Sequence, residues 1–249
     1  MSDATITTDI LNTPVPPPPP AAWWEDYVDL MYAPSDVCAR RAQSGFFVTM
    51  VIVTMLFGLI GLANAGVMQP IMEAEFHRAT AVAIRQNPQA AAMMGKMQSI
   101  GETSAKIGGF IYPPIGIFLT ALALWLVGKI TVGSTQTLAA AMMVTSYAYV
   151  VKVLESIAGG VQAMLMDPAS LTGRYKVSLG VGRFFDPDAT SPVLLAVVGR
   201  LDVFTIWFTI LLAIGLSTTG KVTRQQAAIA AVVLWIVGAL PAVLGAARQ

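Results

Sequence analysis

The sequence predicts an all-α, polytopic membrane protein: a bundle of about five transmembrane helices preceded by an amino-terminal interfacial helix. Of its 249 residues, 55% are hydrophobic and only 12% are charged, whereas about a quarter of the residues of soluble domains are charged. The chain also contains five long intervals that lack charged residues. A bilayer core requires about 20 mostly apolar residues per helix, so each interval predicts one span.

The predicted spans lie within a transmembrane domain that covers residues 44–248. They cover about 46–65, 112–127, 138–157, 203–219 and 226–246. Pro113 and Pro114 lie early in the second span, where prolines open or kink a helix. The third span is the least typical, because it carries Lys152 and Glu155 near its end.

A single apolar run would also fit a buried helix of a soluble protein, but five such runs favour a membrane protein. The first run ends in Ala63-Asn64-Ala65, which resembles the small-residue cleavage site of a signal peptide. The run follows a long amino-terminal segment and is longer than a typical signal core. We therefore expect a retained anchor.

The amino-terminal region divides into a tail and a helix. Residues 1–21 form a proline-rich tail, and such a composition favours extended or disordered chain. We interpret the tail as a spacer, with a proline-rich recognition peptide as the alternative. Residues 22–43 are predicted to form an interfacial amphipathic helix, because tryptophan and tyrosine prefer the headgroup layer. The residues expected at the membrane interface are Trp23, Trp24, Tyr27, Arg40 and Arg41.

Two longer connections separate the spans. Residues 68–106 have a helical composition interrupted by Pro70 and Pro88, which predicts two short helices over the membrane face. Residues 167–200 are rich in proline and glycine, so we expect turns, with residues 174–179 as a short extended piece.

Orientation follows from the distribution of Lys and Arg. One side carries Arg40, Arg41, Lys129, Lys221 and Arg224, and the other side carries a larger number of basic residues in its longer connections. The first group lies close to span ends and in the shortest connectors. We therefore expect the amino terminus in the cytoplasm, with the protein in a bacterial inner membrane.

Several short motifs resemble the Yip1-domain family of membrane proteins, in the form found in bacteria. They are Ala33-Pro34-Ser35-Asp36-Val37, Leu124-Trp125-Leu126-Val127-Gly128-Lys129 with Gly133, Ser146-Tyr147-Ala148, Leu201-Asp202-Val203-Phe204-Thr205-Ile206-Trp207 with Ile214-Gly215-Leu216, and Gln226-Ala227. Their order and spacing carry the resemblance, which covers about residues 33–245.

The resemblance implies a five-helix bundle with a cytoplasmic amino terminus and no enzymatic activity. In eukaryotes it implies roles in vesicle traffic with small GTPases, which do not carry over directly to a bacterium. One departure concerns the third span, where the family usually has a proline after the Tyr-Ala pair and this chain has Val150 and Val151. A straighter third helix is expected.

Ionisable residues at membrane depth are candidate functional groups. Lys152 and Glu155 are predicted to form an intramembrane polar pair, and Arg200 and Asp202 flank the fourth span. The alternative places all four at the interface, where long side chains extend toward the headgroups.

No residues point to a cofactor, a metal or nucleic acid. His77 is the only histidine, and its spacing from Glu73 and Glu75 does not place the three side chains on one helix face. The formal net charge of +1 provides no basic field for nucleic acid. We expect no catalytic, cofactor-binding or metal-binding residues.

Small residues recur at helix spacing within the first and last spans. They let helix backbones approach closely in lipid. The predicted helix-packing residues are Gly58, Gly61, Ala65, Gly238 and Ala242.

The function predicted from the sequence is that of a non-enzymatic accessory or scaffold subunit, or of a factor that organises the membrane. Its expected partners are membrane lipids and other integral membrane proteins of a larger transport, respiratory or photosynthetic assembly. The alternative is a small channel or transporter that uses polar groups of the third and fourth spans.

Overall fold

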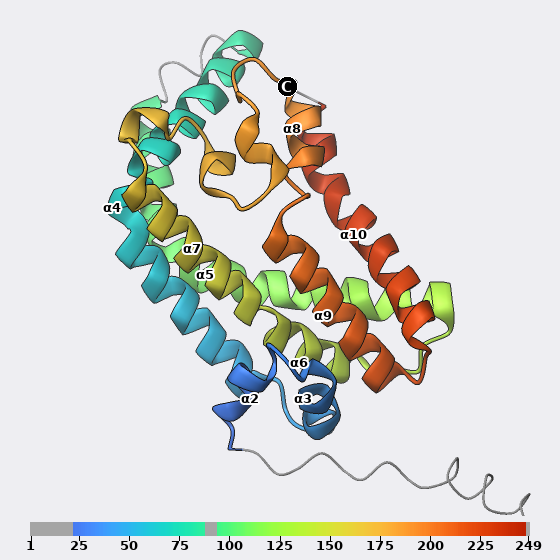
Figure 1. Cartoon of the computed structure of the whole chain (residues 1–249). Coiled ribbons are helices and arrows are strands. Elements are labelled where there is room, and N and C mark those ends of the chain that lie inside the picture. Colours follow the sequence, from blue (N-terminus) through green and yellow to red (C-terminus); the bar gives the residue numbers. More distant parts are fainter. Residues whose placement is uncertain (1–21, 88–93, 248–249) are drawn as a thin grey trace, which may run out of the picture.

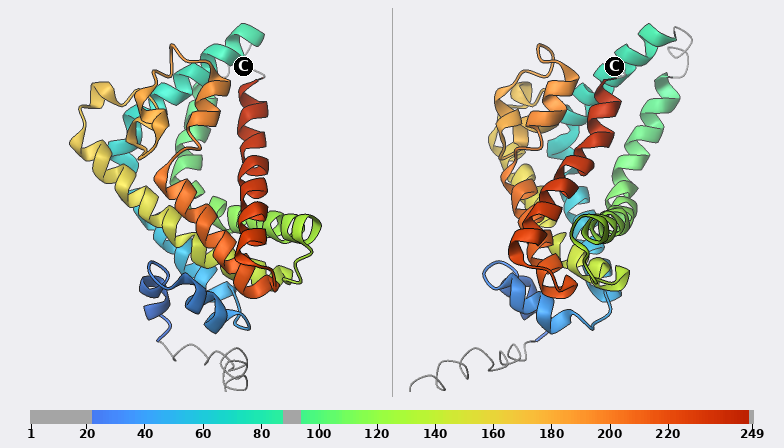
Figure 2. Two further views of the ribbon diagram at one scale, coloured as in Figure 1. Left: turned by 45° about the vertical axis from the view of Figure 1, so that its right-hand side comes forward. Right: turned by 90° about the vertical axis from the view of Figure 1, so that its right-hand side faces the viewer.

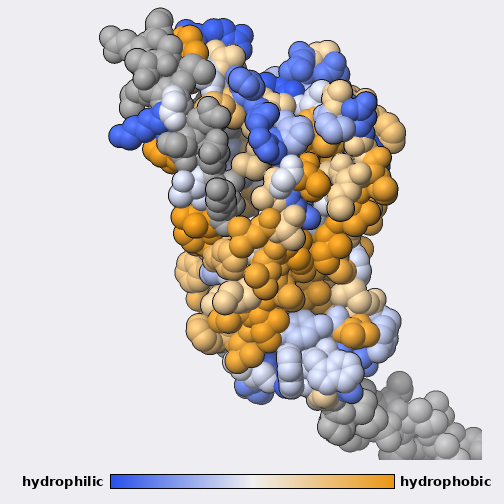
Figure 3. All heavy atoms as spheres, turned by 90° about the vertical axis from the view of Figure 1, so that its left-hand side faces the viewer, coloured by the Kyte–Doolittle hydropathy of each residue, from blue (hydrophilic) through white to orange (hydrophobic). Residues whose placement is uncertain are grey.

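The computed structural model describes residues 22–87 and 94–247, and it is all-α over these ranges (Figure 1). The predicted fold class is confirmed. Five helical segments are long and apolar enough to cross a membrane. On the face that Figure 3 shows, apolar side chains gather over the middle of the molecule, between two more hydrophilic ends. The predicted tail, residues 1–21, lies outside the described residues.

The spans follow one another up and down the bundle. They are α4 (Phe47–Gln86), α5 (Met94–Val132), the pair α6 (Leu138–Ala148) and α7 (Val150–Leu165), α9 (Val203–Gly220) and α10 (Arg224–Ala246). The third span is the most buried, with 61% of its apolar window inside the protein against 17% for α4. The span that looked least typical in the sequence is therefore the central one.

Helix α4 runs through Pro70 without interruption. This corrects the expectation that residues 68–106 form two short helices over the membrane face. A proline removes one backbone hydrogen bond, but neighbouring helices and side chains can compensate for it in membrane proteins. With 40 residues α4 is about 60 Å long, so it extends well beyond the bilayer core.

Helix α5 contains Pro113 and Pro114, and its final part lies across the bundle instead of along it (Figure 2). Next along the chain, α6 and α7 are separated at Tyr149 alone. The Val153 N–H still donates to the Tyr149 carbonyl at 3.1 Å, so the interruption is local and the two helices form one span, Leu138–Leu165.

The amino-terminal segment contains two short helices, α2 (Glu25–Asp29) and α3 (Pro34–Arg41), in place of one continuous helix. Pro34 occupies the first turn of α3, where its missing N–H costs nothing, and it disfavours helical backbone at the preceding residue. Both helices lie at the end of the bundle where α4 begins (Figure 1).

The connection from α7 to α9 lies at the opposite end (Figure 1). It contains the 3₁₀ helices η2 (Pro168–Ser170), η3 (Arg174–Val177) and η4 (Val181–Phe184), and the helix α8 (Pro192–Val198). The expected extended piece at residues 174–179 is wrong, because Arg174–Val177 forms a 3₁₀ turn. Asp202 ends the connection by accepting a hydrogen bond from Phe204 N at 2.9 Å, which caps α9.

Candidate functional site

A buried carboxylate joins the two amino-terminal helices to each other. Asp26 is 0% exposed and accepts hydrogen bonds from both arginines of α3. Arg40 Nη2 lies 2.7 Å from Asp26 Oδ1, and Arg41 Nε lies 2.6 Å from Asp26 Oδ2. Arg40 Nη2 also lies 2.7 Å from Asp29 Oδ2. Charge-assisted bonds of this length are among the strongest in proteins, so α2 and α3 act as one unit.

Aromatic side chains and one threonine connect this unit to the bundle. The Tyr147 hydroxyl of α6 donates to Asp26 Oδ2 at 3.3 Å, and the Tyr27 and Tyr147 rings lie 5.7 Å apart. Thr49 of α4 is buried beside both tyrosine hydroxyls. Burial raises the pKa of Tyr27, so its hydroxyl stays protonated at neutral pH. We call residues 22–43, held in this way, the amino-terminal platform.

The platform also has an apolar side that faces inward. Leu30, Val37 and Cys38 are buried within the central core, and α3 packs against α9. Burial raises the pKa of the Cys38 thiol to about 12. Trp23 and Trp24, by contrast, are 62% and 56% exposed. The five residues predicted for the membrane interface therefore divide: the two tryptophans face outward, whereas Tyr27, Arg40 and Arg41 take part in the network around Asp26.

A second polar cluster lies within the third span. Lys152 Nζ lies 2.6 Å from Glu155 Oε2, with side-chain exposures of 26% and 37%. The same ammonium group donates to Thr205 Oγ1 of α9 at 3.4 Å and lies 5.7 Å from the centre of the Phe208 ring. The structure thus brings together the two residues predicted to pair, and it links them to the start of the fourth span.

The Lys152–Glu155 pair borders a cavity of about 430 Å³ between α4, α5 and α7. The lining residues are Phe57, Tyr112, Pro113, Tyr149, Lys152, Glu155 and Ser156. Aromatic and proline side chains form most of the wall, and the charged pair supplies the strongest polar groups. An apolar pocket with a few polar groups at one place is the usual form of a small-molecule site.

The neighbouring helix contacts explain why this space stays open. Helix α4 packs against both α5 and α7. Its Asn64 Nδ2 donates to the Ser156 carbonyl at 2.9 Å, and a Cβ atom at Gly160 would collide with the Asn64 side chain. On the other side, Tyr149 lies against Gly116 of α5, where a Cβ atom would collide with its hydroxyl. These contacts fix α4, α5 and α7 around the cavity.

The opposite end of the molecule is held by a separate set of polar contacts. Arg78 of α4 bonds Asp188 Oδ1 at 2.7 Å and the Thr172 carbonyl, and Glu75 Oε1 accepts from Arg174 N at 3.1 Å. The bond from Arg78 lowers the pKa of Asp188. These contacts fasten the α7–α9 connection to the extension of α4.

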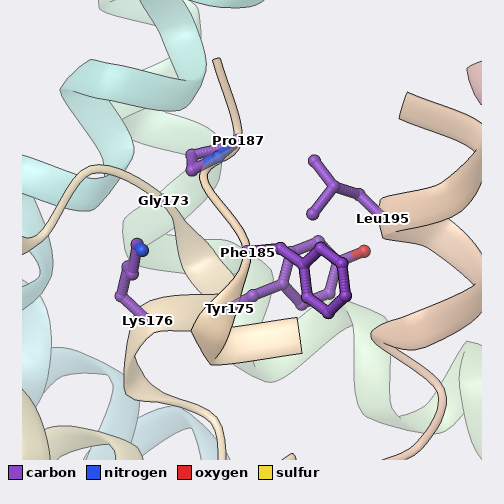
Figure 4. A pocket seen from close by; sticks show the side chains of 6 residues that line it. All are labelled: Gly173, Tyr175, Lys176, Phe185, Pro187 and Leu195. Atoms are coloured by element: carbon purple, nitrogen blue, oxygen red, sulfur yellow. The ribbon is translucent and has the colours of Figure 1, made fainter. Parts of the chain in front are cut away.

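A hollow within this connection is lined by Gly173, Tyr175, Lys176, Phe185, Pro187 and Leu195 (Figure 4). In this view the Tyr175 and Phe185 side chains overlap, and Leu195 lies across the hollow from them (Figure 4). Side chains fill the hollow and leave no volume for a ligand. We therefore treat it as packing.

Comparison with known families supports the resemblance predicted from the motifs. The model of the Yip1 domain matches residues 29–245. The chain belongs to the Yip1 family. Comparisons with the curated proteins and with the solved structures give no match. The Yip1 match includes all five spans and the arginines of α3, and it begins after Asp26, their common acceptor.

The predicted helix-packing residues of this Yip1-family protein lie in different surroundings. Gly58 is buried against Phe110, and a Cβ atom at Gly109 would lie 2.9 Å from Gly58 Cα. Around Gly61 there is open space, and Ala65 and Ala242 are exposed. A Cβ atom at Gly238 would lie 3.2 Å from Arg200 Nη2.

Among residues 22–87 and 94–247, no group of three or more His, Cys, Asp or Glu side chains could hold a metal ion. Sequence reasoning missed two residues, Asp26 and Asn64, which organise the platform and the cavity. The sequence shows acids at 25, 26 and 29 ahead of Arg40 and Arg41, which signals pairing but does not select Asp26. For Asn64 there was no signal beyond its polarity within an apolar run.

Proposed function

We propose that this Yip1-family protein is a non-enzymatic accessory or scaffold subunit that binds another integral membrane protein through its amino-terminal platform. The observation that carries the proposal is the Asp26 network, which holds α2 and α3 in a fixed position. A fixed platform presents Trp23 and Trp24 at a low entropic cost of binding. Exposed tryptophans are also frequent energetic centres of protein interfaces.

Purification in a mild detergent with mass measurement tests this proposal. We expect a complex of defined mass, and we expect the double variant Trp23→Ala/Trp24→Ala to lose the partner while remaining folded. Phe184→Ala is the matched control, because Phe184 is an exposed aromatic residue of the α7–α9 connection, far from the platform. A strictly monomeric protein, or equal loss in the control, would contradict the proposal.

The proposed orientation places the platform on the cytoplasmic side of a bacterial inner membrane. Lys221 and Arg224 support it, because the α9–α10 connector that they flank lies at the same end of the bundle as the platform (Figure 1). The connector that follows Lys129 is joined to it, because Thr135 N donates to the Gly220 carbonyl at 3.0 Å. Five spans then put the carboxyl terminus outside. A reporter enzyme that is active only in the cytoplasm, fused after Gln249, should be inactive; activity would refute this topology.

A second candidate is a small channel or transporter. The observation that favours it is the continuity of polar groups from Glu155 through Lys152 to Thr205 across α7 and α9. Flux through liposomes that contain the purified protein tests this candidate. It requires flux that falls when Lys152 or Glu155 is replaced by alanine, and unchanged flux or no flux excludes it.

A further inference from the structure

We propose that the cavity between α4, α5 and α7 binds the headgroup of a zwitterionic phospholipid, with its phosphate at Lys152 and its ammonium group at Glu155. The observations that lead to this inference are the two opposite charges in the cavity wall, the apolar remainder of that wall and the position of the cavity among helices that could span a membrane. The inference does not depend on the proposed partner-binding function.

The charged groups favour a ligand that carries both signs. An ammonium group has three donors, and the contacts of Lys152 with Glu155 and Thr205 use two of them. Glu155 Oε2 receives the lysine bond, and its other carboxylate oxygen has capacity for a donor from the ligand. A simple anion would be repelled by Glu155, and a simple cation by Lys152. A zwitterion satisfies both groups without removing the existing pair.

The size and the walls of the cavity fit a headgroup with the beginning of its acyl chains. A volume of about 430 Å³ lies within the range of known ligand pockets, about 300 to 1,000 Å³. Phe57 and Pro113 provide apolar wall. Charged side chains at membrane depth are costly when they are isolated, so a charged ligand stabilises the pair while its chains contact the apolar surface.

Exposed apolar residues beside the cavity indicate that its mouth faces lipid and not water. Ile111 and Ile115 flank the lining residues of α5, and Ile157 follows Ser156 on α7. All three belong to helices that are long and apolar enough to cross a membrane, so we infer that their exposed side chains contact acyl chains. A ligand that enters past them arrives from the bilayer, which favours a lipid over a soluble compound.

Native mass spectrometry of the full chain in mild detergent tests the proposal. The probes are phosphatidylethanolamine, phosphatidylglycerol with identical acyl chains, and soluble phosphoethanolamine. We expect phosphatidylethanolamine to bind more tightly than phosphatidylglycerol. Lys152→Gln and Glu155→Gln should each weaken it about tenfold, the effect of losing one charge-assisted hydrogen bond.

Matched controls separate this site from general attraction to charged lipid. Lys129→Gln and Glu73→Gln remove exposed charges of α5 and α4 outside the cavity, and they should leave binding unchanged. Equal binding of phosphatidylglycerol, or no effect of Glu155→Gln, would overturn the proposal. Equal binding of soluble phosphoethanolamine would also overturn it, because the ligand would then not need to be a lipid.

If Lys152→Gln or Glu155→Gln does not fold, a variant that keeps both charges provides a second test. Ser156→Leu adds volume to the cavity wall without changing its charge. We expect a monodisperse protein that no longer retains phosphatidylethanolamine. Unchanged retention by this folded variant would show that the lipid binds elsewhere and would refute the proposal.

Discussion

The two polar clusters of this protein, around Asp26 and around Lys152, both pair a carboxylate with basic side chains, but they have different roles. Asp26 is completely buried, and two arginines and a tyrosine donate to it. Glu155 is 37% exposed, has one lysine partner and borders an open cavity. A buried charge whose bonding capacity is used within the chain holds the fold together. A half-exposed pair beside a cavity keeps capacity for a ligand.

The largest effect on stability is expected from a substitution that disrupts the amino-terminal platform. Asp26→Asn removes the buried negative charge that Arg40 and Arg41 share, and it replaces one of the two accepting oxygens with an amide group that cannot accept from an arginine. We expect the free energy of unfolding to fall by about 3 kcal/mol, measured by thermal unfolding in detergent. Asp36→Asn, an exposed change on α3, should have little effect. An equal loss in both variants would contradict the assigned role of Asp26.

Cys38 provides a local readout of the same change. In the intact protein its thiol is buried with a pKa of about 12, so it reacts slowly with maleimide at pH 8 because the thiolate is the reactive form. Asp26→Asn should increase the labelling rate strongly by releasing α3 from the bundle. A rate that stays at the level of the unaltered protein would show that the platform does not need this carboxylate.

A smaller effect is expected at the contact that positions the cavity wall. Gly109→Ala would place a Cβ atom 2.9 Å from Gly58 Cα, beside Phe57 of the cavity. Forcing α4 and α5 apart should cost about 1 to 3 kcal/mol in thermal unfolding. Gly61→Ala, which adds its methyl group in open space, should be tolerated. The reverse order of stability would refute this view of the helix contact.

Removing the negative charge of the Lys152–Glu155 pair should change the melting temperature less than the substitutions above. Glu155→Gln removes one charge of a partly exposed pair, but Lys152 keeps its hydrogen bond to Thr205 Oγ1 and its contact with the Phe208 ring. We expect the melting temperature to stay close to that of the unaltered protein. A loss as large as that of Asp26→Asn would remove the distinction between a structural cluster and a ligand-binding one.

The smallest effect is expected in the dependence of the melting temperature on acidic pH. The hydrogen bond from Tyr32, followed by that from Arg40, lowers the pKa of Asp29 below its ordinary value of 3.8. A carboxylate with a lowered pKa stabilises the fold above its ordinary value, and this contribution is lost as the pH falls through the folded pKa. Asp29→Asn should therefore show a slightly weaker dependence of its melting temperature on pH below about 4. Identical pH profiles would show that Asp29 contributes nothing.

Much of the fold could be predicted from the sequence because crossing a bilayer is a local requirement. Length and hydropathy identify a span without knowledge of its neighbours, and the positions of the five apolar runs indicated the bundle. The course of α4 through Pro70 could not be predicted in this way. Whether a proline interrupts a helix depends on groups that come from other parts of the chain.

The candidate site was only partly predictable for the same reason. Lys152 and Glu155 lie three residues apart on one helix, so their spacing predicted the pair. The sequence by itself thus determined the spans, the family motifs and this local pair.

Tertiary structure alone decided which acid the arginines of α3 bind, which helix Asn64 contacts and where space remains beside Lys152. Asn64 meets Ser156 across 92 residues, and Lys152 meets Thr205 across 53. Such contacts, and the cavity that they leave open, depend on how helices pack, which composition and periodicity do not encode.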